Sequence, residues 1–200
     1  LVGKKPLIFT NNDSGYETAI EFKKNGVEPI ILDTRKEPNS EIIDEAKKLD
    51  IQVKFSYVVV AAKGYKKVKS AEVAKISDDK KKLGTLENID CDCICVSGFW
   101  TPTIHLASQS GNKTKFNKDI DAFVPGLSKQ NETTLGAANG TFTLEETLKN
   151  SFDSGYELSK KITNNNNKIS SPTVTEKKST THDKFWCVPL PKGKTYKRFL

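Results

Sequence analysis

Short apolar runs alternate with a helix-spaced segment in the N-terminal part of this sequence. Residues 6–10 and residues 27–33 are apolar runs of strand length. Between them, apolar positions recur at helical spacing over residues 13–25, and Asp13 or Ser14 can cap this helix. A strand, a helix and a second strand form a βαβ unit, in which the strands are parallel and the crossover is right-handed. The pattern therefore predicts an α/β fold.

The next segments add a second helix and then change character. Residues 40–49 place their apolar side chains on one helical face, and Ser40 can serve as the N-cap. Residues 57–62 and 66–76 then predict two antiparallel strands joined by a short turn that contains glycine. We therefore expect a parallel sheet covered by helices, with an antiparallel hairpin over 57–77 packed beside it.

A further apolar strand is predicted at residues 91–97, and it contains three of the four cysteines. Cys91, Cys93 and Cys95 alternate along this segment, so a strand would direct all three thiols to one face. Zinc sites usually place two residues between neighbouring cysteine ligands, and a single intervening residue does not match that spacing. We expect no metal site here, and reduced, buried cysteines of the kind found in cytoplasmic proteins.

The second half of the chain is rich in loops. Two short strands are predicted at 121–126 and 132–136. A helix then runs from Thr143 to about Ile162, and Thr143 and Glu146 have the spacing of a capping box. We expect this helix to form a separate layer that exposes part of its apolar face.

The net charge of +7 is concentrated near the C-terminus. Residues 163–200 hold eight basic and two acidic side chains, whereas the preceding part is almost neutral. Residues 163–184 have the composition of a flexible linker rather than of a nucleic-acid-binding arm. Residues 185–191 are apolar again and need a surface to cover, which we expect in missing sequence or in a partner.

Two features limit the class of protein. No run of about eighteen apolar residues occurs, so we expect no membrane-spanning helix. The sequence contains no methionine, which indicates a processed product or a segment of a longer chain.

The first candidate site is the turn at residues 10–16, between the first strand and the first helix. Dinucleotide folds normally hold pyrophosphate at this turn through a G-x-G-x-x-G motif. Only Gly15 of that motif is present, and Asp13 adds negative charge. Asp33 stands where a ribose-binding acid would stand. We favour a retained scaffold, with nucleotide binding as the alternative.

The second candidate site is the small-residue turn at 136–140, before the capped helix. Small residues let a ligand approach the backbone, and a helix N-terminus attracts negative charge. A plain glycine turn before a helix is the alternative. His105 has no second histidine or cysteine nearby in the sequence, and we expect it to be structural.

These stretches also carry a resemblance. They resemble segments of the α subunit of heterotetrameric sarcosine oxidase, and the match extends over most of residues 6–200. The matching stretches are NNDSGY (11–16), SGFWTPTIHLASQSG (97–111), AFVPG (122–126), GAANGTFTLEE (136–146) and KFWCVPLP (184–191). The most specific of them is the stretch at residues 97–111.

The resemblance implies a Rossmann-like flavoprotein with two dinucleotide domains. It assigns residues 1–107 to an inserted second nucleotide-fold domain, and residues 108–162 to a return into the first such domain. Residues 163–184 would be the linker, and residues 185–200 would lead to a folate-binding, aminomethyltransferase-like domain that this sequence lacks. The glycine-rich motif that opens the first domain is also absent from this sequence.

The family's activity is the oxidative demethylation of sarcosine. The resemblance implies NAD in the α subunit, FAD in the β subunit and FMN between them. Oxygen is reduced to hydrogen peroxide, and the methyl carbon leaves as formaldehyde or as methylenetetrahydrofolate. The partners implied are the β, γ and δ subunits, with no nucleic acid and no membrane, and no catalytic residue is assigned to this chain.

The resemblance also implies where the cofactor contacts lie. The residue after Gly136 is Ala137, where flavin-binding relatives carry an acid, and this departure fits NAD. We expect contacts from backbone atoms of Gly136, Ala137, Phe142 and Leu144. The alternatives are a reductase subunit that holds NAD(P)H at residues 10–16, and a non-catalytic assembly module.

Overall fold

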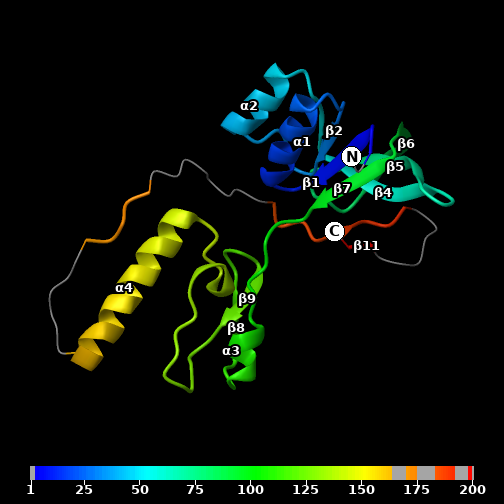
Figure 1. Cartoon of the computed structure of the whole chain (residues 1–200). Coiled ribbons are helices and arrows are strands. Elements are labelled where there is room, and N and C mark those ends of the chain that lie inside the picture. The colour runs from blue at the N-terminus through cyan, green and yellow to red at the C-terminus, as the bar shows by residue number, and fades with distance from the viewer. Residues whose placement is uncertain (1–2, 164–169, 175–182, 192–197, 200) are drawn as a thin grey trace. The chain divides into compact units, whose positions relative to one another are not determined.

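The chain folds into two compact units in a computed structural model (Figure 1). One unit contains residues 1–99 with 181–200, and the other contains residues 100–180. The residues that the structure describes are 3–163, 170–174, 183–191 and 198–199.

A four-stranded parallel sheet forms the centre of the first unit. Its strand order is β3-β2-β1-β7, and every neighbouring pair in it is parallel. The strands are β1 (Pro6–Thr10), β2 (Ile30–Asp33), β3 (Gln52–Phe55) and β7 (Cys93–Ser97). The predicted βαβ unit is confirmed. The second strand begins at Ile30 rather than Val27, after Pro29, whose missing N–H cannot join a ladder.

Two helices cover one face of this sheet (Figure 1). They are α1 (Ser14–Lys24) and α2 (Glu41–Lys48), close to the helices that the apolar spacing predicts. A buried cluster between the helices and the sheet includes Ile8, Tyr16 and Ile43. Each helix therefore buries the apolar face from which it was predicted.

A three-stranded antiparallel sheet packs against the other face of the parallel sheet. The buried cluster between the two sheets includes Leu7, Val58 and Val73. The strands of the antiparallel sheet are β4 (Tyr57–Gly64), β5 (Val68–Ile76) and β6 (Leu83–Asp90). The predicted hairpin is confirmed as β4 and β5. The third strand, β6, pairs with β5 and was not predicted. It lies at the edge of this sheet and is largely exposed, so its sequence lacks the apolar alternation of a half-buried strand.

The expected common face of the cysteines is wrong for Cys91. Cys93 and Cys95 lie on β7 and share a face, with their Sγ atoms 3.7 Å apart. Cys91 precedes the strand and packs in the cluster on the other side of the sheet. β7 is also less buried than predicted, since Val96 is exposed. Among the described residues it is the last strand of its sheet.

The apolar segment near the C-terminus covers a surface of this same chain. Phe185 and Val188 are buried in the core that also contains Leu7 and Val73. A short strand, β10 (Cys187–Val188), pairs antiparallel with β11 (Arg198–Phe199). The expectation that this segment needs an external surface is therefore wrong for Phe185 and Val188. Most of the predicted linker lies outside the described residues.

The second unit contains a two-stranded antiparallel sheet and a long helix. Its elements are α3 (His105–Gln109), β8 (Thr114–Asn117), β9 (Ala122–Pro125), the 3₁₀ helix η1 (Gly136–Asn139) and α4 (Leu144–Thr163). The strand predicted at 121–126 is confirmed as β9, which pairs with β8. The strand predicted at 132–136 is wrong. Glu132 instead accepts hydrogen bonds from Ser110 and Asn112, which tie this segment to the end of α3.

The helix α4 carries its apolar side chains without burying them. None of its residues is buried, and Leu144, Leu158 and Ile162 are exposed, as predicted. In the part of the chain that the structure describes, no helix is both long and apolar enough to cross a bilayer.

Candidate functional site

The turn between β1 and α1 is held by an asparagine side chain. The Ser14 N–H and the Ser14 hydroxyl both donate to Asn12 Oδ1, at 2.9 and 2.7 Å. Asn12 therefore supplies the side-chain cap that was expected from Asp13 or Ser14. Its own amide donates to the carbonyl oxygen of Ser97 at 3.1 Å. The turn is thus fastened to the end of β7 and its first helical N–H has a partner.

Gly15 lets the helix approach the strand. A Cβ at Gly15 would lie 2.6 Å from the Cβ of Thr10, well inside van der Waals contact. Close packing of helix on strand is the role of the last glycine in a dinucleotide motif. The structure therefore keeps the packing glycine of that motif, while buried Asn11 and Asn12 stand in the turn itself.

Asp33, the candidate ribose-binding acid, is fully committed to protein partners. Its side chain has no exposed surface. The Tyr16 hydroxyl donates to it at 2.7 Å, and the Arg35 guanidinium donates at 2.8 and 3.0 Å. Burial, with Asp33 alongside, raises the pKa of Tyr16 far above its usual range. Burial alone would lower the pKa of Arg35, but the bonds to Asp33 and Asp13 raise it. A ribose hydroxyl would have to displace these donors.

Asp13 joins the same network. Its carboxylate accepts from Arg35 Nη1 at 2.7 Å and from the Ser40 hydroxyl at 2.9 Å. Ser40 precedes α2, as predicted, but its side chain makes no capping bond within that helix. Five side chains from three segments therefore form one hydrogen-bonded network beside the turn. Two of them are acids, and the carboxylate of Asp13 disfavours a phosphate at the turn.

The segment at Asp183 covers the carboxyl ends of β1 and β2. The Asp183 N–H donates to the carbonyl oxygen of Asn11 at 2.9 Å, and the Asn11 amide donates back at 3.0 Å. The Asp183 carboxylate accepts from Thr34 at 3.3 Å and also pairs with Lys80. Lys80 and Asp183 were missed by the sequence analysis. The one available signal was Asp183 itself, a rare acid in a basic tail.

The geometry of the first unit does not fit a dinucleotide. Ligands of open α/β sheets bind outside the carboxyl ends of the strands. Here that edge is filled by the chain's own Asn11, Thr34 and Asp183, and Asp33 is saturated. The structure therefore favours a retained scaffold at residues 10–16 over a nucleotide site.

The second candidate turn lies in the second unit and depends on two glycines. Gly136 and Gly140 have φ angles of 64° and 82°, in the left-handed region that favours glycine. A Cβ at Gly140 would lie 2.6 Å from Ile120 Cδ1, and one at Gly136 would lie 3.2 Å from Thr147 Cγ2. Both glycines are therefore explained by turn geometry and packing within this unit.

Half of the predicted capping box is present at the start of α4, because Glu146 bonds the Thr143 hydroxyl rather than the Thr143 N–H. Thr143 Oγ1 accepts the Glu146 N–H at 3.4 Å and donates to the Glu146 carboxylate at 2.9 Å. Glu145 and Glu146 make the first turn acidic, which weakens its attraction for an anion.

The four predicted contact residues all lie in the short stretch from η1 to the first residue of α4. Gly136 is buried, Phe142 is half-buried, and Ala137 and Leu144 are exposed. Their contact with a cofactor remains a prediction. His105 is exposed at the start of α3. Among the described residues no cluster of three or more potential metal ligands occurs.

A comparison with solved structures defines the fold class of this chain. The bacillithiol disulfide reductase of Staphylococcus aureus matches with a TM-score of 0.50 at 14% sequence identity, over 70% of this chain and 47% of that chain. With the parallel sheet, its covering helices and the adjoining antiparallel sheet, this match gives an α/β, Rossmann-like fold, as predicted.

The sequence comparisons point to one set of relatives. This chain is 33% identical over 141 residues to the sarcosine oxidase subunit alpha of Rhizobium meliloti (strain 1021), and 27% identical over 148 residues to that of Corynebacterium sp. (strain P-1). These alignments cover 70% and 73% of this chain, but only 13% and 15% of those relatives. No family model matches the sequence. The resemblance to sarcosine oxidase α subunits is confirmed, and the chain spans about one seventh of the length of these relatives.

Proposed function

We propose that this chain is an internal part of the α subunit of a flavin-dependent oxidase that demethylates sarcosine. The observation that carries the proposal is the 33% identity over 141 residues to a sarcosine oxidase subunit alpha. The α/β fold agrees with a role in a flavin and nicotinamide enzyme. The described residues provide no complete active site, so we assign the amine chemistry to other parts of the assembly.

The complete enzyme would contain α, β, γ and δ subunits and act in the cytoplasm. Its flavins, FAD in the β subunit and FMN between β and α, would supply the oxidation of sarcosine and the reduction of oxygen to hydrogen peroxide. Tetrahydrofolate, bound outside this sequence, would accept the methyl carbon, which otherwise leaves as formaldehyde. The role of this chain would be to hold NAD and to assemble with β.

We propose that backbone atoms of Gly136, Ala137, Phe142 and Leu144 contact NAD in the longer subunit. The exposed, uncharged Ala137 supports this proposal. A helix terminus contributes on the order of 0.3–2 kcal/mol to binding an anion. That is too little to hold NAD, so residues 1–200 alone should bind it very weakly at best.

The activity is tested by co-expressing the full-length α gene with the neighbouring β, γ and δ genes. We expect a flavin absorption spectrum and hydrogen peroxide formed in proportion to sarcosine consumed. A purified complex with no flavin spectrum, and no turnover of sarcosine or other N-methyl amino acids, would refute the proposal.

The cofactor contact is tested in the same complex by measuring NAD released on denaturation. We expect Ala137→Asp to reduce the NAD content, because it places a carboxylate beside the cofactor. Asn150→Asp adds the same charge at an exposed position in the second turn of α4, and should leave the NAD content unchanged. Equal NAD content in the two variants would contradict the assignment.

Calorimetry on the 200-residue chain separates the alternatives. Micromolar NAD binding would move the site to Asn11–Tyr16 and Asp33, and would favour an NAD(P)H-dependent reductase subunit. The filled strand edge of the first unit instead favours the second alternative, in which this unit is an assembly module. That alternative predicts that the chain captures the β subunit while binding no nucleotide.

A further inference from the structure

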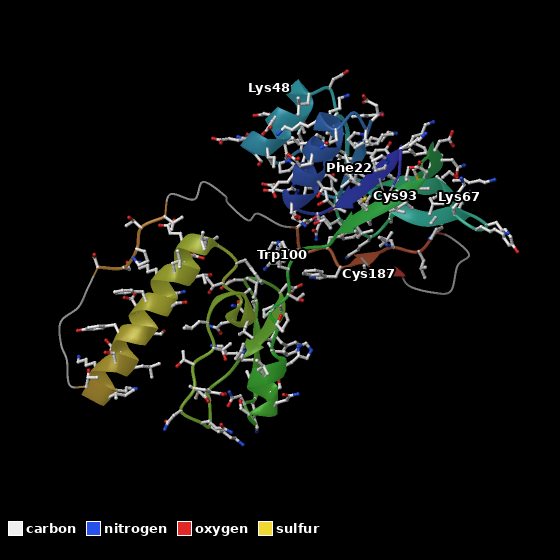
Figure 2. All side chains as sticks on the ribbon, in the orientation of Figure 1. Phe22, Lys48, Lys67, Cys93, Trp100 and Cys187 are labelled. Carbon is white, nitrogen blue, oxygen red and sulfur yellow. The ribbon has the colours of Figure 1, made fainter. Side chains whose placement is uncertain are left out.

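The segment at residues 183–188 lies on the first unit, although the second unit separates it in sequence from the rest of that unit. Its last two residues form β10, on which Figure 2 labels Cys187. In the described part of the chain, β10 pairs with β11 and belongs neither to the parallel sheet nor to the three-stranded sheet. The segment can therefore leave the first unit without breaking a ladder hydrogen bond of either sheet.

The first anchor of this segment is Asp183, which is held through both its backbone and its carboxylate. The Asp183 N–H donates to the Asn11 carbonyl oxygen at 2.9 Å, and the Asn11 amide donates to the Asp183 carbonyl oxygen at 3.0 Å. The carboxylate accepts from the Thr34 hydroxyl at 3.3 Å and pairs with Lys80. Because Asn11 and Thr34 are buried, the first unit holds them in fixed positions that suit an acidic residue.

The second anchor is Phe185, two residues further along the chain. Its side chain is 5% exposed and packs in the buried cluster between the two sheets. Lys80 Nζ lies 5.8 Å from the centre of this ring, within the range of a cation–π contact. The same ammonium group therefore contacts both the acidic and the aromatic residue of the segment.

The third anchor is Val188, three residues beyond the aromatic residue. Its side chain is 3% exposed in the same buried cluster, which includes Leu7 of β1 and Val73 of β5. The strand β10 that carries it lies against β4. The three anchors are thus an acidic, an aromatic and an aliphatic side chain at a fixed spacing, and each has its own contacts on the first unit.

These contacts are of the kind that hold a bound peptide. Ligands of open α/β sheets bind outside the carboxyl ends of the strands, and Asp183 lies there. Peptide recognition takes affinity from main-chain hydrogen bonds and specificity from pockets for spaced side chains. Asn11 supplies the first, and Lys80 with the apolar cluster supplies the second. We propose that the first unit contains a peptide-binding groove for an acidic, an aromatic and an aliphatic residue at this spacing, and that residues 183–188 are its built-in, exchangeable occupant.

Attachment to the same chain keeps the built-in segment in place. A tethered ligand has an effective concentration in the millimolar range, and tethering raises the apparent affinity by about 10²–10⁴-fold. A separate peptide therefore competes poorly while residues 183–188 remain joined to the rest of the chain. Cutting the chain before Asp183 removes this advantage, and the groove should then exchange its occupant for a peptide of the same chemistry.

The test is peptide binding by the full chain before and after one cut. A specific protease recognition sequence replaces residues 175–181, and the probe is a fluorescein-labelled peptide with the sequence of residues 183–200. Fluorescence anisotropy should show saturable binding to the cut chain, and binding at least about 100-fold weaker to the same chain uncut. Equal binding to both, or no binding to the cut chain, would overturn the proposal. So would loss of the folded circular-dichroism spectrum on cutting, because the segment would then be an inseparable part of the core.

Variants of the peptide test specificity without changing the folded chain. Phe185→Ala in the peptide should weaken binding more than about 100-fold, because a buried ring is lost. Asp183→Asn should weaken it about 10-fold, because the charge that meets Lys80 is lost. Cys187→Ser is the matched control, since its Sγ contacts the carbonyl oxygen of Val188 within the segment itself. Equal affinity of the Phe185→Ala and Cys187→Ser peptides would contradict the groove.

One pair of variants tests the groove side. Lys80→Met in the cut chain should weaken peptide binding about 10-fold, because the acidic residue loses its cation. Lys81→Met, at an exposed position one residue away, should leave the affinity unchanged. Equal affinity in these two variants would refute the contact on which the recognition of the acidic residue depends.

Discussion

Replacing Arg35 by methionine should destabilise the first unit severely. Arg35 donates to Asp33 through Nε and Nη2 and to Asp13 through Nη1. Its side chain is 7% exposed, and that of Asp33 has no exposed surface. Methionine fills a similar volume but leaves the Asp33 carboxylate buried without its cation.

The magnitude follows from the burial of that carboxylate. Removing one partner of a buried ion pair costs about 3–5 kcal/mol, because the remaining charge stays desolvated. That is a large part of the roughly 5–15 kcal/mol that keeps a domain folded. Asp33→Asn removes the charge, so Arg35→Met should cost at least about 1 kcal/mol less in that background.

The assay is urea unfolding followed by tryptophan fluorescence. Trp186 lies in the first unit, so a Trp100→Phe background makes the signal report that unit alone. Lys36→Met is the matched control. Lys36 pairs with Asp78, but both side chains are at least three-quarters exposed, and such pairs contribute about 0–1 kcal/mol. An Arg35→Met cost no larger than that of Lys36→Met, or strict additivity with Asp33→Asn, would refute the reasoning.

Four further predictions use urea unfolding, followed by Trp186 fluorescence for the changes in the first unit and by Trp100 fluorescence in a Trp186→Phe background for the change in α4. Gly15→Ala should cost roughly 1–3 kcal/mol through overpacking against the first strand. Gly155→Ala, where an added Cβ meets nothing within 4 Å, should instead stabilise α4 by about 0.5–1 kcal/mol. Phe185→Ala should cost about 3–5 kcal/mol because the ring is 5% exposed, whereas Tyr65→Ala, at 94% exposure, should change stability by less than about 0.5 kcal/mol. The backbone N–H groups of Lys4 and Lys5 lower the pKa of Asp92 in the folded chain. The ionised carboxylate therefore stabilises the fold above the pKa of a free aspartate, about 3.9. This stabilisation is lost as the pH falls through the lower pKa of Asp92 in the folded state. Asp92→Asn should therefore be less stable than wild type at pH 7, with the difference shrinking under strong acid, and a constant difference would contradict the assignment.

Much of the first unit could be predicted because its signals are local. The strand at Pro6–Thr10, the helix from Ser14 and the hairpin of β4 and β5 each follow from the spacing of apolar residues over a few positions. The contact between Thr143 and Glu146 at the start of α4 was predictable for the same reason, since the two side chains are three residues apart.

The missed strand β6 lacks such a signal. It is an edge strand with few buried side chains, so its sequence shows little apolar alternation. β3 was missed although its four residues, Gln52–Phe55, alternate between polar and apolar. The segment at 132–136 has residues compatible with a strand, but the hydrogen bonds of Glu132 hold it in another conformation. A side chain that reaches across twenty residues leaves no periodic trace in the sequence.

The candidate site was only half predictable. The sequence identified the degenerate turn, with Gly15 alone remaining from the motif and Asp33 at the expected strand end. It could not show that Asp33 is consumed by Tyr16 and Arg35. Nor could it show that Asp183, far along the chain, closes the strand edge. Both facts are long-range contacts whose partners are set by the fold.

The sequence by itself determined the α/β class, the order of the first strands and helices, and the resemblance to sarcosine oxidase α subunits, because these depend on local spacing and residue identity. Tertiary structure alone decided which face of the sheet each cysteine takes. Because β7 begins at Cys93, Cys91 lies outside the alternation of that strand and packs on the opposite side of the sheet from Cys95. Tertiary structure also decided that Phe185 completes the chain's own core. Alternation of residues along a strand specifies which face each side chain takes, but only within that strand. Which distant segments share a buried surface cannot be deduced from their separation along the chain.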